Sequence, residues 1–206
     1  MSEKLVVATK NKKKLEEIKE ILKDFDLEII SLENYPSTPK IVENGKTFSE
    51  NAVIKAVKIA RFTKKLTMGE DSGLCVDALG GKPGVYSSRF SGKDKNDAKN
   101  NEKLLESLGS LPLKERKAHY TCAVALADKD GIIGVVEGRC SGVIGYEPSG
   151  SFGFGYDPLF IIPKYKKTFA QLGPEIKHKM SHRYKALVKA KKLILNYLKS
   201  QAANCF

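Results

Sequence analysis

Apolar residues along the first part of the chain recur with the two periods that distinguish strands from helices. Residues 5–9 and 27–30 are short apolar runs that predict buried strands. Between these runs, apolar positions recur at steps of three and four residues and predict a helix with one buried face: Leu15, Ile18, Leu22 and Phe25. Two prolines and a glycine predict an irregular loop over residues 31–45. The chain therefore begins with a strand, a helix and a strand.

A second helix is predicted to begin at Thr47, because Thr47 and Glu50 have the spacing of a capping box. Its apolar positions share one face: Phe48, Ala52, Ala56, Ile59 and Ala60. Residues 66–68 and 74–78 predict two strands, so the acidic sequence between them is expected at a turn.

The second half of the chain predicts a glycine-rich loop, a polar helix, a hairpin, a last strand and a C-terminal helix. The loop covers residues 80–92, and the polar helix ends at Leu108. The hairpin pairs residues 120–127 with 132–136, the last strand covers 159–162, and Ser181 caps the C-terminal helix. The hairpin turn at 128–131 has the Asp and Gly residues that such turns require. The inner face of the last helix is predicted to hold Ala186, Ala190, Ile194 and Tyr197. This order indicates an α/β or α+β fold with a mixed sheet, in a single domain over residues 1–206.

Composition agrees with a folded protein: 206 residues, 41% hydrophobic and 29% charged. No apolar run reaches the roughly 18 residues of a membrane helix. The cysteines contain no CxxC pair, which argues against a zinc ribbon or a dithiol redox centre: Cys75, Cys122, Cys140 and Cys205. Unpaired cysteines, and a strand-like run that starts too early to leave room for a signal peptide, predict a cytoplasmic location.

The net charge of +12 is concentrated near the C-terminus. From Pro163 onward there are eleven basic residues and one acidic residue, which together carry +10. Such a field attracts polyanions, whether nucleic acid, acidic lipid or phosphorylated small molecules. A nucleic-acid-binding module is therefore one alternative, with lysines of the last helix following a phosphate backbone: Lys185, Lys189, Lys191 and Lys192. No known nucleic-acid-binding motif accompanies them.

Two segments carry residues suited to phosphate chemistry. In Glu70-Asp71-Ser72-Gly73, adjacent carboxylates could hold Mg²⁺ and accept a proton from water, or Asp71 and Ser72 could only cap a turn. In residues 9–14, a strand ends and a helix begins with four lysines. Free N–H groups at a helix start attract anions, so a bound anion would explain lysines that are otherwise unfavourable there; a solvated basic turn is the alternative.

Two further segments could recognise a base. Residues 151–158 alternate glycines with aromatic rings, which could stack on a base or be buried in the core. Residues 177–183 place His and Arg donors at a helix start, as carbonyl or phosphate recognition requires. By contrast, Glu16, Glu17 and Glu20 have the EExxE spacing of an all-helical pyrophosphohydrolase family but no partner helix, and are predicted to be solvated surface.

Five segments together resemble the inosine triphosphate pyrophosphatases, over nearly the whole chain from Val6 to about Leu198. They are ATKNKKK, GKTFSENAVIKA, EDSGLCVDALGGKPGVYSSRFSG, FGYDPLF and KHKMSHR. The resemblance implies hydrolysis of ITP, dITP and XTP to the monophosphate and pyrophosphate, which keeps these nucleotides out of DNA and RNA. It also implies a long, bent mixed β-sheet flanked by helices, two lobes with a central nucleotide cleft, Mg²⁺ as cofactor and a homodimer without a stable nucleic-acid partner.

The resemblance also implies a role for each matching residue. Asp71 is the expected proton acceptor, and Asp71, Glu43 and Glu70 are the expected magnesium ligands. Thr9, Lys10, Asn11, Lys12, Lys13, Lys14 and Lys55 are expected to contact the phosphates. Ser72, Phe154, Gly155, Tyr156, Asp157, Lys177, His182 and Arg183 are the other expected substrate contacts, His182 and Arg183 reading the purine 6-oxygen.

The chain departs from the family pattern at two places. The family often has glycine where Lys10 and Lys13 stand, and paired glycines where this chain has Phe152-Gly153. A pyrimidine-directed pyrophosphatase of the related Maf-like fold is a further alternative, but the FGYD and SHR segments match the purine branch.

Overall fold

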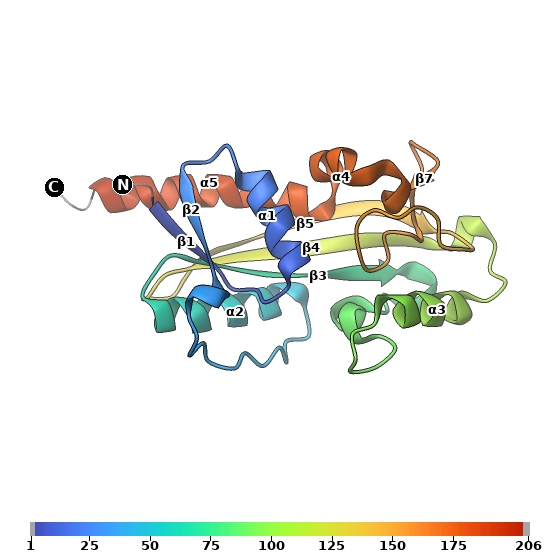
Figure 1. Cartoon of the computed structure of the whole chain (residues 1–206), viewed down its shortest axis with the longest axis horizontal. Helices are drawn as coiled ribbons and strands as arrows, with labels where there is room; N and C mark the ends of the chain where they lie inside the picture. Colours follow the sequence, from blue (N-terminus) through green and yellow to red (C-terminus); the bar gives the residue numbers. More distant parts are fainter. Residues whose placement is uncertain (1–2, 204–206) are drawn as a thin grey trace. The chain divides into compact units, whose positions relative to one another are not determined.

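The computed structural model describes residues 3–203 and shows a mixed α/β protein (Figure 1). In this range the strands are β1 (Glu3–Val7), β2 (Leu27–Ser31), β3 (Thr67–Val76), β4 (Lys117–Ala127), β5 (Ile132–Ile144), β6 (Phe160–Ile162) and β7 (Lys167–Thr168). The α-helices are α1 (Lys12–Leu22), α2 (Phe48–Thr63), α3 (Asp97–Leu108), α4 (Phe169–Met180) and α5 (His182–Ala203). Short 3-10 helices cover Leu32–Asn34, Asp77–Leu79, Gly84–Arg89 and Leu113–Glu115. The predicted fold class is confirmed.

The described strands form one seven-stranded sheet in the order β2-β1-β3-β4-β5-β6-β7. β1 pairs in parallel with β2 and β3, whereas β6 pairs antiparallel with β5 and β7. The helices and strands divide into two compact units. Within the described residues, unit 1 comprises 3–71, 122–138 and 183–203, and unit 2 comprises 72–121 and 139–182. Two units agree with the two predicted lobes; the nucleotide cleft stays a prediction.

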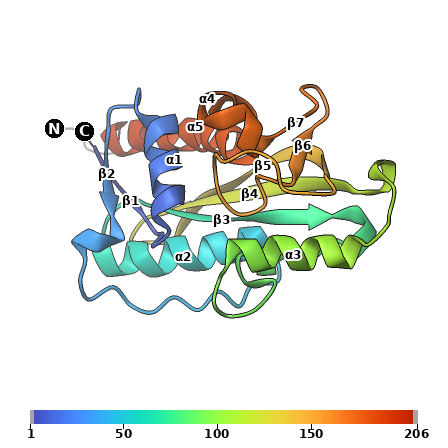
Figure 2. The same cartoon turned by 45° about the vertical axis from the view of Figure 1, so that its right-hand side comes forward.

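The side chains of β1 explain why unit 1 has helices on both sides. Successive side chains of a strand point to opposite faces. Leu5 and Val7 pack with α1 and α5, whereas Val6 and Ala8 pack with Ile59 of α2. Figures 1 and 2 show α2 on one face of this part of the sheet and α1 and α5 on the other. A strand buried on both faces has a continuous apolar sequence, which is why this strand could be predicted.

β3 is one continuous strand, so the prediction of two strands separated by a turn was wrong. Glu70 and Asp71 lie in its interior and are 1% and 7% exposed. Adjacent charged residues are usually exposed, but here buried cations compensate both carboxylates, Arg183 for Glu70 and Lys55 for Asp71. The strand therefore continues through a sequence that resembles a turn, and Ser72 is half-buried in it rather than capping a turn.

Unit 2 has its own apolar core, in which Leu104 and Leu108 of α3 are buried in the same cluster as Phe160 and Phe169. The sequence predicted no helix over residues 169–180, where the structure has α4. Gly173 has φ 76° and ψ 176° inside this helix, and a proline follows it. The kink interrupts the helical period, so the pattern of apolar residues does not reveal α4.

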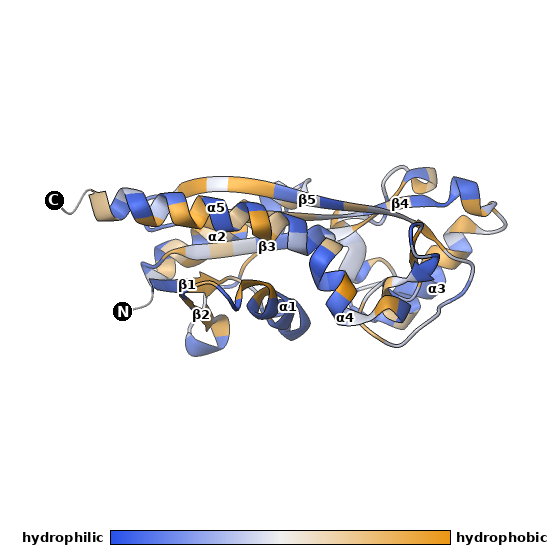
Figure 3. Ribbon diagram, turned by 90° about the horizontal axis from the view of Figure 1, so that it is seen from above, coloured by the Kyte–Doolittle hydropathy of each residue, from blue (hydrophilic) through white to orange (hydrophobic). Residues whose placement is uncertain are grey.

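The predicted hairpin and C-terminal helix are confirmed. The Asp128 amide donates to the Gly131 carbonyl at 3.0 Å between β4 and β5, and β5 continues eight residues beyond the predicted end, to Ile144. α5 begins directly after Ser181 and buries Ala190 and Ile194. Figure 3 shows hydrophobic and hydrophilic bands that alternate along α5. None of the helices in residues 3–203 has the length and apolar character needed to cross a bilayer.

Candidate active site

The junction between β1 and α1 forms the predicted lysine-rich helix start. Asn11 caps α1, because its Oδ1 accepts a hydrogen bond from the Lys14 amide at 3.1 Å. Thr9 Oγ1 accepts from the Asn11 amide at 3.1 Å. The first turn contains no acidic residue. The positive end of the helix therefore coincides with lysine side chains, of which Lys10, Lys12 and Lys13 are exposed.

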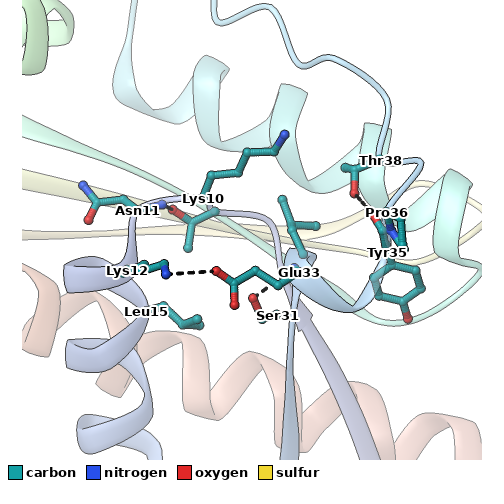
Figure 4. A pocket seen from close by; sticks show the side chains of 11 residues that line it. Lys10, Asn11, Lys12, Leu15, Ser31, Glu33, Tyr35, Pro36 and Thr38 are labelled. Atoms are coloured by element: carbon teal, nitrogen blue, oxygen red, sulfur yellow. Dashed lines mark hydrogen bonds and ion pairs between the residues drawn. The ribbon is translucent and has the colours of Figure 1, made fainter. Parts of the chain in front are cut away.

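A pocket of about 290 Å³ opens beside this helix start (Figure 4). It is lined by the β1–α1 junction and by residues that follow β2: Thr9, Lys10, Asn11, Lys12, Leu15, Ser31, Leu32, Glu33, Tyr35, Pro36 and Thr38. The Lys12 ammonium lies 3.6 Å from a Glu33 carboxylate oxygen, and both side chains are mostly exposed. An exposed pair contributes little stability, so an anion could replace Glu33 at low cost.

Lys55 of α2 holds two of the predicted carboxylates together. Its Nζ lies 2.9 Å from Asp71 Oδ1 and 2.9 Å from Glu43 Oε2. The second oxygen of Asp71 accepts from Asn51 Nδ2 at 3.2 Å, and Asn51 Oδ1 accepts from the Gly45 amide at 2.8 Å. Asn51 thus joins the segment that carries Glu43 to the proposed proton acceptor.

α2 can place these side chains because it packs directly on β3. A Cβ on Gly69 would lie only 2.1 Å from the Ala52 carbonyl oxygen, so only glycine allows this approach. Asn51 and Lys55 are four residues apart and therefore share one face of the helix. Thr47 caps α2 as predicted, through the Glu50 amide at 3.1 Å.

Glu70 is surrounded by donors from three other segments of unit 1. Its Oε2 lies 3.0 Å from Lys14 Nζ, and its Oε1 accepts from Arg183 Nη2 at 3.1 Å and from Cys122 Sγ at 3.2 Å. Arg183 Nη1 also donates to Glu17. The prediction that Glu17 is solvated surface was wrong, because α1 turns this residue inward and it is 8% exposed.

The ionisation of these carboxylates differs because their partners differ. Burial raises the pKa of Asp71 above its usual value, and Lys55 only partly offsets this. Burial also acts to raise the pKa of Glu70, but Lys14, Arg183 and Lys55 hold it well below its usual value. Burial lowers the pKa of Lys55, yet Asp71 and Glu43 raise it overall. Asp71 is therefore the more basic of the two adjacent carboxylates.

The carboxylates fit a hard divalent cation in their chemistry but not as one preformed cluster. Among residues 3–203, no group of three or more His, Cys, Asp or Glu side chains is arranged to hold a metal ion. Asp71 and Glu43 do converge on one point, which the Lys55 ammonium occupies. Glu70 Oε2 is buried, and its partner is the Lys14 ammonium 3.0 Å away. Carboxylate oxygens are the ligands that Mg²⁺ prefers, so these residues could hold it if Lys55 moves aside.

In unit 2, Asp157 organises the predicted aromatic–glycine loop. Its Oδ2 accepts from the Phe154 amide at 2.9 Å and from Lys177 Nζ at 2.6 Å. The Gly155 amide donates to Asp97. The Tyr156 hydroxyl donates to the Ser87 carbonyl, and Tyr156 is 3% exposed, so its ring belongs to the core.

The remaining predicted contacts are His182 and Arg183. The His182 ring stacks on Tyr120 in unit 2, with centroids 4.6 Å apart and planes at 10°. Arg183 is 1% exposed and binds Glu17 and Glu70 in unit 1. The proposed reading of the purine 6-oxygen by these two residues stays a prediction.

Asn51 and Glu17 are the main site residues that sequence reasoning missed. Asn51 could have been found, because it lies one helical turn before Lys55 in the segment GKTFSENAVIKA. Glu17 had no comparable signal, since its partner Arg183 is 166 positions away.

Comparison with known proteins identifies the family. The Ham1 family profile matches residues 5–193. This chain belongs to the Ham1 family. It is 48% identical over 191 residues to the dITP/XTP pyrophosphatase of Desulforamulus reducens, covering 93% of this chain and 95% of that protein. The family model and this relative, a named pyrophosphatase, favour an enzyme over the nucleic-acid-binding alternative.

Two solved Ham1 structures share the fold. The HAM1 protein from Coxiella burnetii has a TM-score of 0.86 and 38% identity, covering 94% of this chain and 99% of that one. The Staphylococcus aureus Ham1 protein has a TM-score of 0.84 and 36% identity, covering 95% and 100%. The mixed sheet flanked by helices is therefore the Ham1 fold.

Proposed function

We propose that this Ham1 protein hydrolyses deaminated purine nucleoside triphosphates (ITP, dITP and XTP) to the monophosphate and pyrophosphate, and that residues 1–206 form one pyrophosphatase domain. The observation that carries the proposal is the ion-pair group in which buried Lys55 bridges buried Asp71 and the more exposed Glu43. A buried carboxylate beside lysines is suited to water attack on a phosphoanhydride, and the names of the relatives agree with that reaction.

The helix start of α1 is the proposed phosphate-binding element. The positive end of this helix, together with Lys10, Lys12, Lys13 and Lys14, offers hydrogen-bond donors and positive charge to the triphosphate. Lysine ammonium groups have three donors each, so Lys14 can keep its contact with Glu70 while it binds a phosphate oxygen.

Asp71 is the proposed proton acceptor. Asn51 binds one of its oxygens, and in the absence of Mg²⁺ Lys55 binds the other, so the carboxylate is held in one orientation. The pKa of Asp71, raised by burial, makes it a better base than an exposed aspartate. Water attacks the α-phosphorus and gives up a proton to Asp71. The bond from the α-phosphorus to the α–β bridging oxygen breaks, and pyrophosphate leaves.

Mg²⁺ is the proposed cofactor, held by Asp71 and Glu43 with Glu70 beside them. When bound, it supplies charge neutralisation of the phosphates. Lys55 would then be released from the two carboxylates and become available to a phosphate oxygen. We assign base recognition to His182, Arg183 and the unit 2 contacts Ser72, Phe154–Asp157 and Lys177.

We also propose a homodimer in the cytoplasm without a stable nucleic-acid partner. Cys75 and Cys122 are free thiols, as a reducing compartment favours, whereas Cys205 lies outside the described residues. Light scattering on the purified protein tests the dimer.

The test of the reaction is pyrophosphate release from ITP, dITP, XTP, GTP, ATP and UTP, with and without Mg²⁺. We expect metal-dependent release from the deaminated purines only. Asp71→Asn should fold normally and lose about 10²–10⁴-fold in kcat, whereas Asp26→Asn, at an exposed aspartate, should not change kcat. Release of inorganic phosphate instead, faster hydrolysis of UTP than of ITP, or near-normal activity of Asp71→Asn would refute the proposal.

A further inference from the structure

Glu17 is a buried acid in α1, beside the buried apolar residues Ile18 and Leu22. It is 8% exposed, whereas its neighbour Glu16 and the next acid, Glu20, are exposed. A buried carboxylate costs free energy unless a charged partner compensates it. Here the partner is Arg183, which is itself 1% exposed.

Arg183 connects Glu17, through Glu70, to the start of α1, the proposed phosphate-binding element. Its Nη1 binds Glu17, and its Nη2 binds Glu70 Oε1 at 3.1 Å. The other oxygen of Glu70 lies 3.0 Å from Lys14 Nζ. Four side chains of alternating charge thus connect Glu17 to Lys14.

This path is closed, because Lys14 and Glu17 belong to the same turn of α1. Residues three apart on a helix are neighbours on one face. The ring runs from Lys14 through Glu70 and Arg183 to Glu17 and returns along the helix backbone. A guanidinium has its donors in a rigid fork, so binding two carboxylates fixes its orientation. Glu70 is then fixed, and with it the Lys14 ammonium.

We infer that Glu17 is a positioning residue for the triphosphate, acting through Arg183 and Glu70 to hold the Lys14 ammonium at the start of α1. The inference rests on the proposed function, because it takes that helix start as the phosphate-binding element. The Glu17 carboxylate does not contact the phosphates; it prevents Arg183 from turning away from Glu70.

The experiment compares Glu17→Gln with Glu16→Gln, the same substitution at the exposed neighbour. Binding of inorganic tripolyphosphate is measured by calorimetry, and ITP hydrolysis gives KM and kcat. For Glu17→Gln we expect Kd for tripolyphosphate and KM for ITP to rise about tenfold, with kcat within about twofold of wild type. Glu16→Gln should leave all three unchanged. Glu17→Asp keeps the charge, should lose less affinity than Glu17→Gln, and serves if Glu17→Gln does not fold.

The sign of the effect separates positioning from simple charge. Each glutamine substitution removes one negative charge, which through the long-range field alone would strengthen anion binding. Weaker binding in Glu17→Gln alone therefore supports the ring. Unchanged Kd and KM in Glu17→Gln overturn the inference. This holds even if the variant is less stable, because a purely structural role lowers stability without changing affinity. Equal weakening in both variants overturns it as well.

Failure of the proposed function gives a different result. If the wild-type protein hydrolyses no nucleotide but Glu17→Gln selectively weakens tripolyphosphate binding, the positioning role stands and the reaction does not.

Discussion

Gly69 is the position at which a single methyl group should disturb both the fold and the site. It lies on β3 under the backbone of α2, and a Cβ there would be 2.1 Å from the Ala52 carbonyl oxygen and 2.6 Å from the Ala56 amide nitrogen. Both neighbours are backbone atoms of a helix, so neither can move alone. Gly69→Ala should push the whole of α2 away from β3.

The structure gives the size of this shift. A carbon atom and a carbonyl oxygen come no closer than about 3.3 Å, so α2 must retreat by about 1 Å. Asn51 has a short side chain and donates to Asp71 at 3.2 Å, a distance that would then exceed hydrogen-bonding range. Overpacking costs about 1–3 kcal/mol, and loss of a hydrogen bond to a charged group costs about 1.5–3 kcal/mol. We expect a decrease of about 3–5 kcal/mol in the free energy of unfolding, and a lower kcat because Asp71 loses its orientation.

Urea denaturation and ITP hydrolysis measure the two effects. Gly134→Ala is the matched control, since its new Cβ would meet only the flexible end of Leu193, at 3.1 Å, and should change stability by less than about 1 kcal/mol. If Gly69→Ala unfolds within about 0.5 kcal/mol of wild type and keeps its kcat, the direct packing of α2 on β3 does not hold the site together.

Three further predictions concern side chains. Asp71 is the proposed base and must be ionised to accept a proton, and burial raises its pKa. We therefore expect kcat/KM for ITP to fall as the pH decreases through a pKa above about 3.9, the value for exposed aspartate; an acidic limb at or below that value contradicts the assignment. Asn51→Asp keeps an acceptor for the Gly45 amide but replaces the donor to Asp71 with a negative charge, so kcat should fall at least about tenfold while circular dichroism stays normal; an unchanged kcat would mean that this hydrogen bond does not orient the base. Tyr197→Phe removes the hydrogen bond to Asp128 at 3.0 Å and should lower the free energy of unfolding in urea by about 1 kcal/mol without changing ITP hydrolysis. A change in KM for ITP would contradict this separation of the hairpin from the site.

Local signals in the sequence determined most of the elements and the types of functional residue. The apolar run of β1, the cap at Thr47 and the turn at Asp128 each depend on residues a few positions apart. Such signals are complete within a short window, because helix caps and hairpin turns are closed by their own residues. The lysine-rich start of α1 could be predicted for the same reason.

Only the tertiary structure decided which charges are buried and what compensates them. Local pattern placed Glu70 and Asp71 in a turn and Glu17 in solvent, and all three are buried. The Arg183 guanidinium compensates both Glu17 and Glu70. Arg183 lies 166 positions after Glu17 and 113 positions after Glu70 in the sequence. The cost of burying a carboxylate is offset only when its partner arrives from another segment. Because that partner is absent from the local window, periodicity alone predicts a solvent-exposed surface where the folded protein has its buried candidate site.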